Sequence, residues 1–304
     1  MTPPLRRVRE QEFMGTDLPL QSASLTINRL DDLVRQVRDL PALPQAVTRV
    51  LQLTEDPKSG MADVARALSS DIGLVTRVLK LANSGFYGSA GRIGTISEAI
   101  VILGLRTTRN IALAASCQEM LEREVQGYYL PSGALWRHSL ACAAAAHNLA
   151  KRTHYRGIEE AFIAGLLHDI GKIIIGAYLK SDFDQVLTRV AVGDITYSNA
   201  EREILGFDHA EAGARILERW NLPGSLVSAV RYHHSPQEAT TYSLAAFVHV
   251  ADMICLTLGV GMGIDGLAYA LDPNALAALN LTSEDFEEVA SETCDWLSQD
   301  NLYT

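Results

Sequence analysis

The sequence predicts an all-α fold, with a helical N-terminal subdomain packed on a second bundle of helices. Hydrophobic residues make up 48% of the 304-residue chain, which is enough to build a sizeable core. Ala, Leu, Arg, Glu and Gln dominate the apolar stretches, and these side chains lose little rotamer freedom in a helix. Proline, which breaks helices, is scarce inside the same stretches.

The charge of the chain argues against a polyanionic partner. The formal net charge is −10 and the pI is near 5.3, so no uniform positive field exists to hold nucleic acid. No apolar run reaches the ~18 residues that a membrane-spanning helix needs, and no apolar segment follows the basic residues near the start. We expect a cytoplasmic protein that binds neither nucleic acid nor membrane.

The cysteines show no pattern of a thiolate metal site. Cys117, Cys142, Cys255 and Cys294 lie far apart and form no CxxC pair. This spacing excludes structural zinc held by thiolates, and we expect free buried thiols in a reducing cytosol.

The sequence of the first half predicts a flexible tail followed by short helices. Residues 1–25 mix polar residues and prolines without any period, whereas the apolar residues from Leu30 onward recur at helical spacing. Asp71 can cap the helix that follows it. Ser97 with Glu98 begins another helix, which ends at Gly104. The expected helices cover residues 30–39, 44–55, 61–68, 72–82, 97–103 and 107–121.

A Gly/Ser loop over residues 84–91 places two aromatic side chains, Phe86 and Tyr87, between glycines. The loop could serve as a lid or a partner contact. A packing contact between the two halves is favoured, because aromatic side chains bury large apolar areas.

Segment 126–133 is predicted to link the two halves without regular structure, and we place the domain boundary there. The predicted organisation is a flexible tail over 1–25, a helical subdomain over 26–130 and a second helical subdomain over 131–304. No fixed-period repeat is present, which excludes a solenoid. The expected helices of the second half cover residues 134–152, 158–169, 182–193, 197–205, 208–220, 223–234, 242–258, 264–271 and 283–298.

All eight histidines lie in the second half, between His138 and His249. His147 and His154 share a helix with His138 but point nearly opposite to it at ~100° per residue, so we expect both on the surface. His168-Asp169 ends an apolar helix, and Gly171 fits a turn with positive φ or a close backbone approach. Taken alone, the pair could equally be a core histidine beside a helix-end carboxylate.

Further donors follow the His168-Asp169 pair. His209 begins a helix after Asp208, the adjacent His233 and His234 end another, and Asp252 lies in a very apolar helix. A carboxylate there costs several kcal/mol of desolvation unless it is paired or metal-bound. The candidate metal ligands are His138, His168, Asp169, His209, His233, His234 and Asp252.

These are more donors than one octahedral cation uses while keeping a site for water, so we expect two divalent metal ions. Two such ions would stand roughly 3.5–4 Å apart, polarise a phosphoryl group and supply a bridging hydroxide. Imidazole and carboxylate without thiolate suit Fe, Mn, Ni or Zn.

Several of these motifs resemble known families. His138, His168-Asp169 and Asp252 look like the H…HD…D pattern of the HD-superfamily phosphohydrolases, and the other histidines resemble the ligand set of the HD-GYP branch. The first half is similar to the HDOD family in Leu40-Pro41-Ala42-Leu43-Pro44, in residues 70–84 (SDIGLVTRVLKLANS) and in residues 96–104 (ISEAIVILG). The resemblance covers residues 30–258 and implies an HD-type bundle and a regulatory or adaptor role in bacterial signal transduction.

Two departures from the resemblance bear on activity. Ser235-Pro236-Gln237-Glu238 stands where cyclic di-GMP phosphodiesterases have a Gly-Tyr-Pro element, and Ala134 stands where a ligand for a third metal is often found. Conversely, the chain keeps the main ligand set and Lys172, which could neutralise a bound phosphate. If the site is catalytic, Asp169 and Lys172 are the expected catalytic residues.

Three functions follow as hypotheses. The favoured one is a binding or scaffold module that uses a metal-containing HD-type half and recognises a protein partner in a signalling pathway. The alternative is a metal-dependent phosphohydrolase acting on a phosphate-bearing small molecule, such as a nucleotide or cyclic dinucleotide. A purely structural helical protein is the weakest of the three, because the ligand set is complete.

Overall fold

The computed structural model describes residues 30, 42–84, 87, 92–178, 180–193, 195–239, 242–261, 263 and 271–299. Within these ranges every regular element is a helix, and the only β pairing is an isolated bridge between Val125 and Leu130. The predicted all-α fold is therefore confirmed. The predicted tail 1–25 and the predicted helices 30–39 and 264–271 lie outside the described residues, apart from Leu30 and Leu271.

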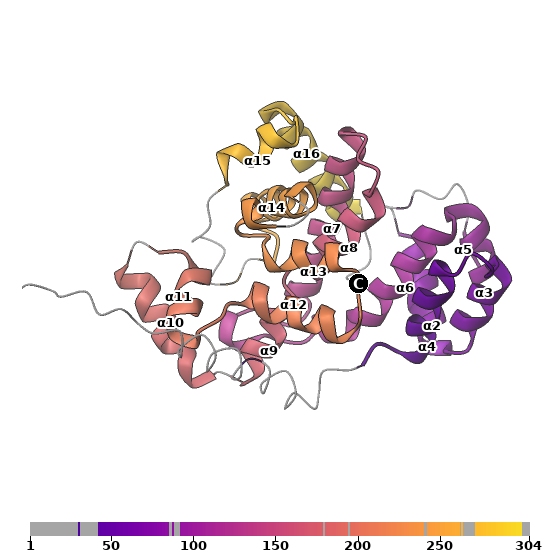
Figure 1. Ribbon diagram of the computed structural model, residues 1–304, viewed down its shortest axis with the longest axis horizontal. Coiled ribbons are helices and arrows are strands. Elements are labelled where there is room, and N and C mark those ends of the chain that lie inside the picture. The colour runs from indigo at the N-terminus through magenta and orange to yellow at the C-terminus, as the bar shows by residue number, and fades with distance from the viewer. Residues whose placement is uncertain are drawn as a thin grey trace, which may run out of the picture.

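The N-terminal half contains five described helices, which form the indigo and purple group in Figure 1. The turn signals of the sequence set several of their ends. Asp71 accepts a hydrogen bond from the backbone nitrogen of Leu74, and Gly104 has a φ of 86° between two helices. The helices are α2 (Gln45–Glu55), α3 (Met61–Ser69), α4 (Ile72–Ala82), α5 (Ile96–Leu103) and α6 (Leu105–Leu121).

The second half is a larger bundle in which α7 packs against both α8 and α14. Figure 1 shows α9, α12 and α13 on one side of these central helices and α15 and α16 on the other. The elements are η1 (Gln126–Tyr128), α7 (Ala134–Arg152), α8 (Ile158–Leu167), α9 (Gly171–Tyr178), α10 (Lys180–Val192), α11 (Tyr197–Leu205), α12 (His209–Arg219), α13 (Gly224–Arg231), η2 (Pro236–Glu238), α14 (Tyr242–Thr257), α15 (Pro273–Ala278) and α16 (Ser283–Gln299).

The structure corrects several predicted helix ends. Thr95, and not Ser97, caps the start of α5: its hydroxyl accepts from the nitrogen of Glu98, whose carboxylate accepts from the nitrogen of Thr95. Helices α8 and α13 end before His168 and His233, so both histidine motifs lie in turns. The sequence analysis did not predict α9 or α15. Helix α9 was missed because its glycines and consecutive isoleucines favour helix only weakly.

The two halves meet at α6, α8 and the loop after α4. The ring of Tyr87 lies 6.2 Å from that of Phe162 on α8, which is the predicted packing contact between halves. Asn110 on α6 donates to the carboxylate of Glu159 at 2.8 Å. Phe86 lies outside the described residues.

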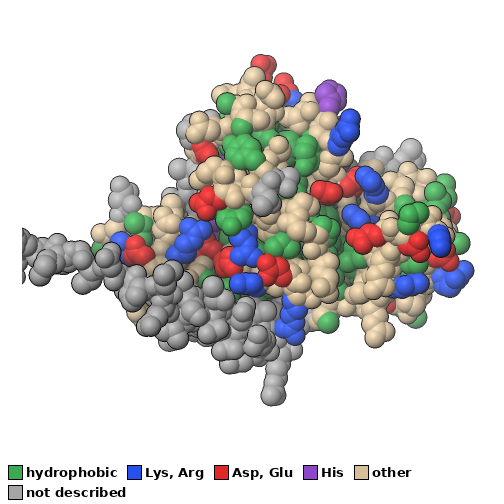
Figure 2. Space-filling view, in the orientation of Figure 1, with side chains coloured by type: hydrophobic (Ala, Val, Ile, Leu, Met, Phe, Trp, Pro, Cys, Tyr) green, Lys and Arg blue, Asp and Glu red, His purple; other side chains and the backbone are tan. Residues whose placement is uncertain are grey.

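The surface carries both signs of charge. Figure 2 shows Lys and Arg side chains interspersed with Asp and Glu on one face, without a block of one sign. None of the helices in the described ranges combines the length and the apolar content that a bilayer crossing requires.

Candidate metal centre

The turn between α8 and α9 carries the His168–Asp169 pair. The ring of His168 donates from Nδ1 to the backbone oxygen of Gly165 at 2.7 Å. Gly171 begins α9, and a Cβ atom there would lie 1.9 Å from the backbone oxygen of His209. The close approach predicted for Gly171 is present, but at the start of a helix and without a positive φ.

His138 and Asp252 reach this pair from α7 and α14. His138 Nε2 lies 3.1 Å from Oδ1 of Asp252 and 3.3 Å from Nε2 of His168. Its Nδ1 donates to the backbone oxygen of Val260 at 2.9 Å. Oδ1 of Asp252 lies 3.7 Å from Nε2 of His168, so imidazoles surround the carboxylate in the apolar helix.

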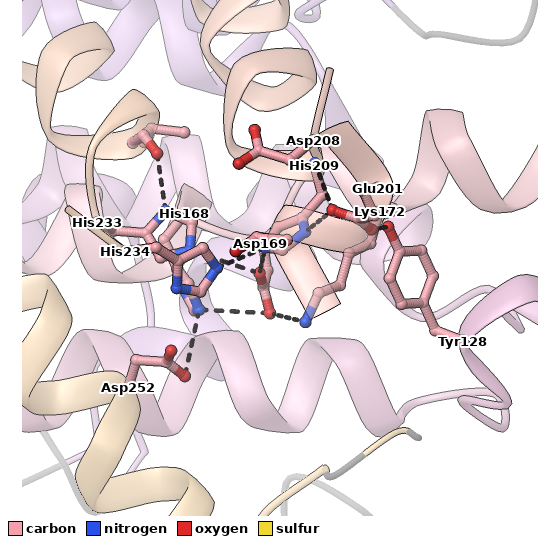
Figure 3. A network of polar contacts seen from close by, with 12 residues as sticks. Tyr128, His168, Asp169, Lys172, Glu201, Asp208, His209, His233, His234 and Asp252 are labelled. Atoms are coloured by element: carbon pink, nitrogen blue, oxygen red, sulfur yellow. Dashed lines mark hydrogen bonds and ion pairs between the residues drawn. The ribbon is translucent and has the colours of Figure 1, made fainter. Parts of the chain in front are cut away.

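The other histidines approach Asp169 from a second side. His209 is the first residue of α12, which Asp208 caps. Its Nε2 lies 3.4 Å from Oδ1 of Asp169 and 2.8 Å from Nε2 of His234. Nε2 of His233 lies 4.0 Å from the same oxygen of Asp169. Figure 3 shows these side chains converging around Asp169, so the predicted ligands from distant parts of the chain lie together.

The imidazoles of His138, His168, His209 and His233 share one orientation. Each Nδ1 faces an oxygen: a backbone carbonyl for three of them, and the carboxylate of Glu201 for His209. Because these oxygens accept, each Nδ1–H donates to one of them, which leaves the Nε2 lone pair for a metal ion or a proton at the centre. Histidine ligands of metals are usually held in this way.

The spacing of the nitrogens fits a metal. The Nε2 atoms of His138 and His168 are 3.3 Å apart, and those of His209 and His234 are 2.8 Å apart. Nitrogens bound ~2.0–2.1 Å from one ion stand about 2.8–3.4 Å apart at octahedral or tetrahedral angles. Nε2 of His233 is buried without a hydrogen-bond partner in the described part of the chain. A cation would satisfy these lone pairs.

Asp169 stands between two groups of ligands. Its Oδ2 lies 3.5 Å from His138 and 3.3 Å from His168, whereas its Oδ1 faces His209 and His233. A carboxylate with oxygens divided in this way can bridge two cations. Groups that could hold an ion are His138–His168–Asp169, His168–His233–Asp252 and His209–His233–His234.

The centre is enclosed by protein. His168, His209 and His233 have no exposed surface, and Asp169 is 2% exposed. Only His234 among the candidate ligands is half-buried. On the face in Figure 2, histidine is visible only at a single spot near the upper edge.

Charge interactions shift the pKa values of these groups in opposite directions. Burial, the largest single effect, lowers the pKa of His168, but the charges and hydrogen bonds of Asp169 and Asp252 together outweigh it and raise that pKa to about 10. Burial opposes ionisation of Asp169, yet His168 and Lys172 hold its pKa well below the usual range. Burial and neighbouring histidines lower the pKa values of His233 and His234.

Lys172 is held inside the centre. Its Nζ lies 2.6 Å from Oδ2 of Asp169 and 5.5 Å from the centroid of the Tyr128 ring, and the residue is 7% exposed. In this arrangement the ammonium neutralises Asp169, the other residue that we predicted to be catalytic.

Three residues around the centre were missed by the sequence analysis. Glu201 accepts from Nδ1 of His209 at 2.7 Å and from the hydroxyl of Tyr128. Glu201 occupies the buried stripe of α11 at positions 197, 201 and 205, so helical periodicity could have revealed it. Both ring nitrogens of His249 form hydrogen bonds: Nδ1 with the backbone oxygen of His233, and Nε2 with the backbone nitrogen of Asp272. His249 therefore helps to hold the turn that carries His233.

The predictions of which histidines are exposed and which cysteines are buried hold only in part. His154 is exposed as expected, although it lies beyond the end of α7 and not in the same helix as His138. His147 is half-buried, because α7 is buried over most of its length. Cys117, Cys142 and Cys255 are buried free thiols, whereas Cys294 is exposed, contrary to the expectation of buried thiols.

The helical bundle and its buried histidine–aspartate centre define a class of all-α proteins with a potential metal site. A model of the HDOD domain matches residues 40–236, and the chain belongs to the HDOD family.

The proteins similar to this chain match it over most of its length. An uncharacterized protein of Treponema pallidum (strain Nichols) is 30% identical over 210 residues, covering 66% of this chain and 38% of that protein. The match therefore spans less than half of that relative. A Geobacter sulfurreducens HDOD domain protein of unknown function has a TM-score of 0.69 at 26% identity, covering 90% of this chain and 98% of that one. A Shewanella amazonensis SB2B protein, provisionally named a phosphohydrolase, has a TM-score of 0.67 at 30% identity, covering 88% and 94%.

Proposed function

We propose that this protein is a cytoplasmic regulatory module whose metal-containing HD-type half supports binding of a protein partner in a signalling pathway. The enclosure of the centre carries the proposal: the donors converge, yet His168, His209 and His233 have no exposed surface. A buried ion of this kind stabilises the folded state because it binds only there. Buried free thiols such as Cys117 and Cys142 support a reducing compartment.

The donor chemistry supports divalent Fe, Mn, Ni or Zn. His138, His168 and Asp252 would hold one ion, His209, His233 and His234 a second, and Asp169 would bridge them. Such ions, when bound, act as Lewis acids and lower the pKa of bound water. The protein itself fixes the ring orientations and excludes bulk water.

The partner would contact the N-terminal half. Several large apolar side chains are exposed there: Met61 is 57% exposed, Ile72 83%, Val101 76% and Ile102 56%. Exposed aliphatic residues on neighbouring helices favour a protein surface as the ligand over a small anion.

The second candidate function is a metal-dependent phosphohydrolase. The divided oxygens of Asp169 favour it, because a bridging carboxylate is what a two-metal hydrolytic site requires. The Shewanella amazonensis protein with a similar fold is provisionally named for that activity. Against it, the chain after His234 folds into η2, which contains no Gly-Tyr-Pro element, and Lys172 is engaged by Asp169.

Metal content tests the proposal most directly. Protein purified without a metal-binding tag is analysed by elemental mass spectrometry and then melted before and after chelation. We expect one or two equivalents of a divalent transition metal and a melting temperature that falls by several degrees on chelation. Metal-free protein that does not bind added Mn²⁺, Fe²⁺, Ni²⁺ or Zn²⁺ would refute the metal centre, and an unchanged melting temperature would refute its stabilising role.

A further inference from the structure

The segment between the two halves packs into the second half beside the metal centre. Tyr128 in η1 has no exposed surface, although its neighbour Tyr129 is 65% exposed. A Cβ atom on Gly127 would lie 1.9 Å from the ring of Phe183, and one on Gly176 would lie 2.4 Å from Val125. We call residues 125–130 the connector; it fits closely against α9 and α10.

The hydroxyl of Tyr128 joins the connector to a ligand. It donates to Oε1 of Glu201, whose Oε2 accepts from Nδ1 of His209 at 2.7 Å and from its backbone nitrogen at 3.0 Å. Figure 3 shows Tyr128, Glu201 and His209 as one continuous chain of contacts. Both oxygens of a fully buried carboxylate are therefore satisfied, one by the connector and one by the candidate ligand.

The ring of Tyr128 also lies near Lys172, which pairs with Asp169. Nζ of Lys172 lies 5.5 Å from the centroid of the Tyr128 ring and 2.6 Å from Oδ2 of Asp169. A change in the position of Asp169 therefore reaches the Tyr128 ring through Lys172, and a change in the position of His209 reaches the Tyr128 hydroxyl through Glu201. Hydrogen bonds in such a buried chain polarise one another, so strengthening one strengthens the next.

We propose that Tyr128 and Glu201 are positioning residues that couple occupancy of the metal centre to the packing of the connector between the halves. The inference rests on the proposed metal centre. Binding at Nε2 fixes the His209 ring and makes its Nδ1–H a stronger donor to Glu201, which holds Tyr128 in place. Linkage is reciprocal, so a well-packed connector must in turn raise metal affinity.

The aromatic packing of Tyr128 can be separated from its hydroxyl. The ring centroid lies 5.1 Å from Phe183 and 5.5 Å from Tyr197, contacts that a phenylalanine would keep. If Tyr128 serves only this packing, Tyr128→Phe would leave Zn²⁺ affinity unchanged. Tyr129→Phe removes the same hydroxyl from the adjacent exposed residue and is the matched control.

The experiment measures two quantities in wild type, Tyr128→Phe, Tyr129→Phe and Glu201→Gln. Zn²⁺ affinity is determined by competition with a chromophoric chelator, and hydrogen exchange of the connector is followed with and without Zn²⁺. Loss of a residue that orients a histidine ligand typically weakens metal affinity ~10–100-fold. We expect Glu201→Gln in that range, Tyr128→Phe nearer ~10-fold, and Tyr129→Phe unchanged. Zn²⁺ should slow connector exchange in wild type and Tyr129→Phe, and much less in Tyr128→Phe.

The outcomes separate the two proposals. Zn²⁺ binding by Tyr128→Phe with wild-type affinity and wild-type slowing of connector exchange would overturn the coupling while leaving the metal centre intact. Absence of Zn²⁺ binding in wild type would overturn both. If Glu201→Gln does not fold, Tyr128→Phe and its control still decide the question.

Discussion

At the scale of single residues, the centre holds buried charges that need a cation or protons to balance them. Asp169, Asp252 and Glu201 are buried carboxylates, and the buried ammonium of Lys172 pairs with Asp169. Unbalanced charge in such surroundings is strongly unfavourable. The raised pKa of His168 follows from this imbalance, because in metal-free protein a proton supplies the missing positive charge. Metal ions and protons therefore compete for the same nitrogens.

This competition predicts how pH affects metal-free protein. The pKa of His168 rises from 6.5 to about 10 on folding. A pKa raised by folding adds stability that is complete below the unfolded value and is lost as pH rises toward the folded value. We therefore expect the melting temperature of chelated protein to fall by a few degrees between about pH 7 and about pH 9.

Groups with lowered pKa values do not disturb this window. His233 and His234 have pKa values well below 6.5 in the folded protein, so their contribution is constant above about pH 7. Calorimetry in chelator across that range provides the measurement. A melting temperature that stays level or rises would contradict the protonated state of His168.

A second prediction at this scale concerns the ligands themselves. His168→Asn should abolish binding at the His138–His168–Asp169 group and lower the melting temperature of metal-loaded protein toward that of chelated wild type. The N-terminal half should stay folded, because no candidate ligand lies there. Metal analysis and circular dichroism measure both effects.

His154→Asn is the matched control for this substitution. His154 is exposed and has a φ of 54°, a conformation that asparagine tolerates better than most residues. We expect its metal content and melting temperature to equal those of wild type. Equal metal content in the two variants would remove His168 from the ligand set.

At the scale of elements, the contact between α9 and α12 sets the distance between Asp169 and His209. Gly171 makes it possible: an added Cβ would lie 1.9 Å from the oxygen of His209 and 2.5 Å from the nitrogen of Gly213. Both obstacles are backbone atoms, so the helices must separate to relieve the clash. Gly171→Ala should therefore destabilise the protein by about 3 kcal/mol or more and lower metal affinity.

Gly224→Ala is the matched control for that helix contact. Gly224 also begins a helix, α13, and nothing lies within 4 Å of an added Cβ there. We expect no loss of stability, and a gain of up to about 1 kcal/mol from the less flexible unfolded chain. Urea unfolding compares the variants; similar midpoints would show that the α9–α12 contact can relax.

The sequence predicted long helices well and short buried ones poorly. Residues 134–152 were assigned correctly as α7 because Ala and Leu dominate them, and Asp71 was recognised as a cap from its side-chain chemistry. Helix α9 was missed, since its stability comes from packing against α12 and η1 rather than from intrinsic propensity.

The candidate ligands could be predicted from the sequence because their motifs are local. The residues that orient these ligands could not be predicted in the same way. His168-Asp169 and His233-His234 are adjacent pairs that the sequence displays directly. Glu201 and Tyr128 acquire their roles only when α11 and the connector fold beside His209. A contact between residues 73 positions apart is set by tertiary structure, and a single sequence contains little signal for it.

At the scale of the whole molecule, the centre ties together segments that are far apart in the chain. His138 and Asp252 come from α7 and α14, while His168 and His209 come from the turn after α8 and the start of α12. A bound cation therefore cross-links most of the second half. The first half is joined to it by the connector and by contacts such as that of Asn110 with Glu159, which suits a regulatory arrangement of two coupled parts.

The last prediction concerns what this whole arrangement can catalyse: we expect little or no hydrolysis of cyclic di-GMP, even with metal present. A hydroxide source is insufficient, because the substrate must be held in line and its charge met by positioned donors. Here His168 and His233 are fully buried, Lys172 is paired with Asp169, and Glu238 in η2 adds negative charge after the histidine pair.

The assay incubates purified protein with cyclic di-GMP and Mn²⁺ or Fe²⁺, beside an Asp169→Ala control that lacks the carboxylate proposed to bridge the two ions. The expected result is no difference between the two proteins. Turnover on the order of 1 s⁻¹ or faster in wild type that disappears in the control would mean that the centre opens to substrate. Since a site as enclosed as this one must move to admit a dinucleotide, such turnover would also require a conformational change around His234, the half-buried ligand. The phosphohydrolase would then replace the binding module as the better account of this fold.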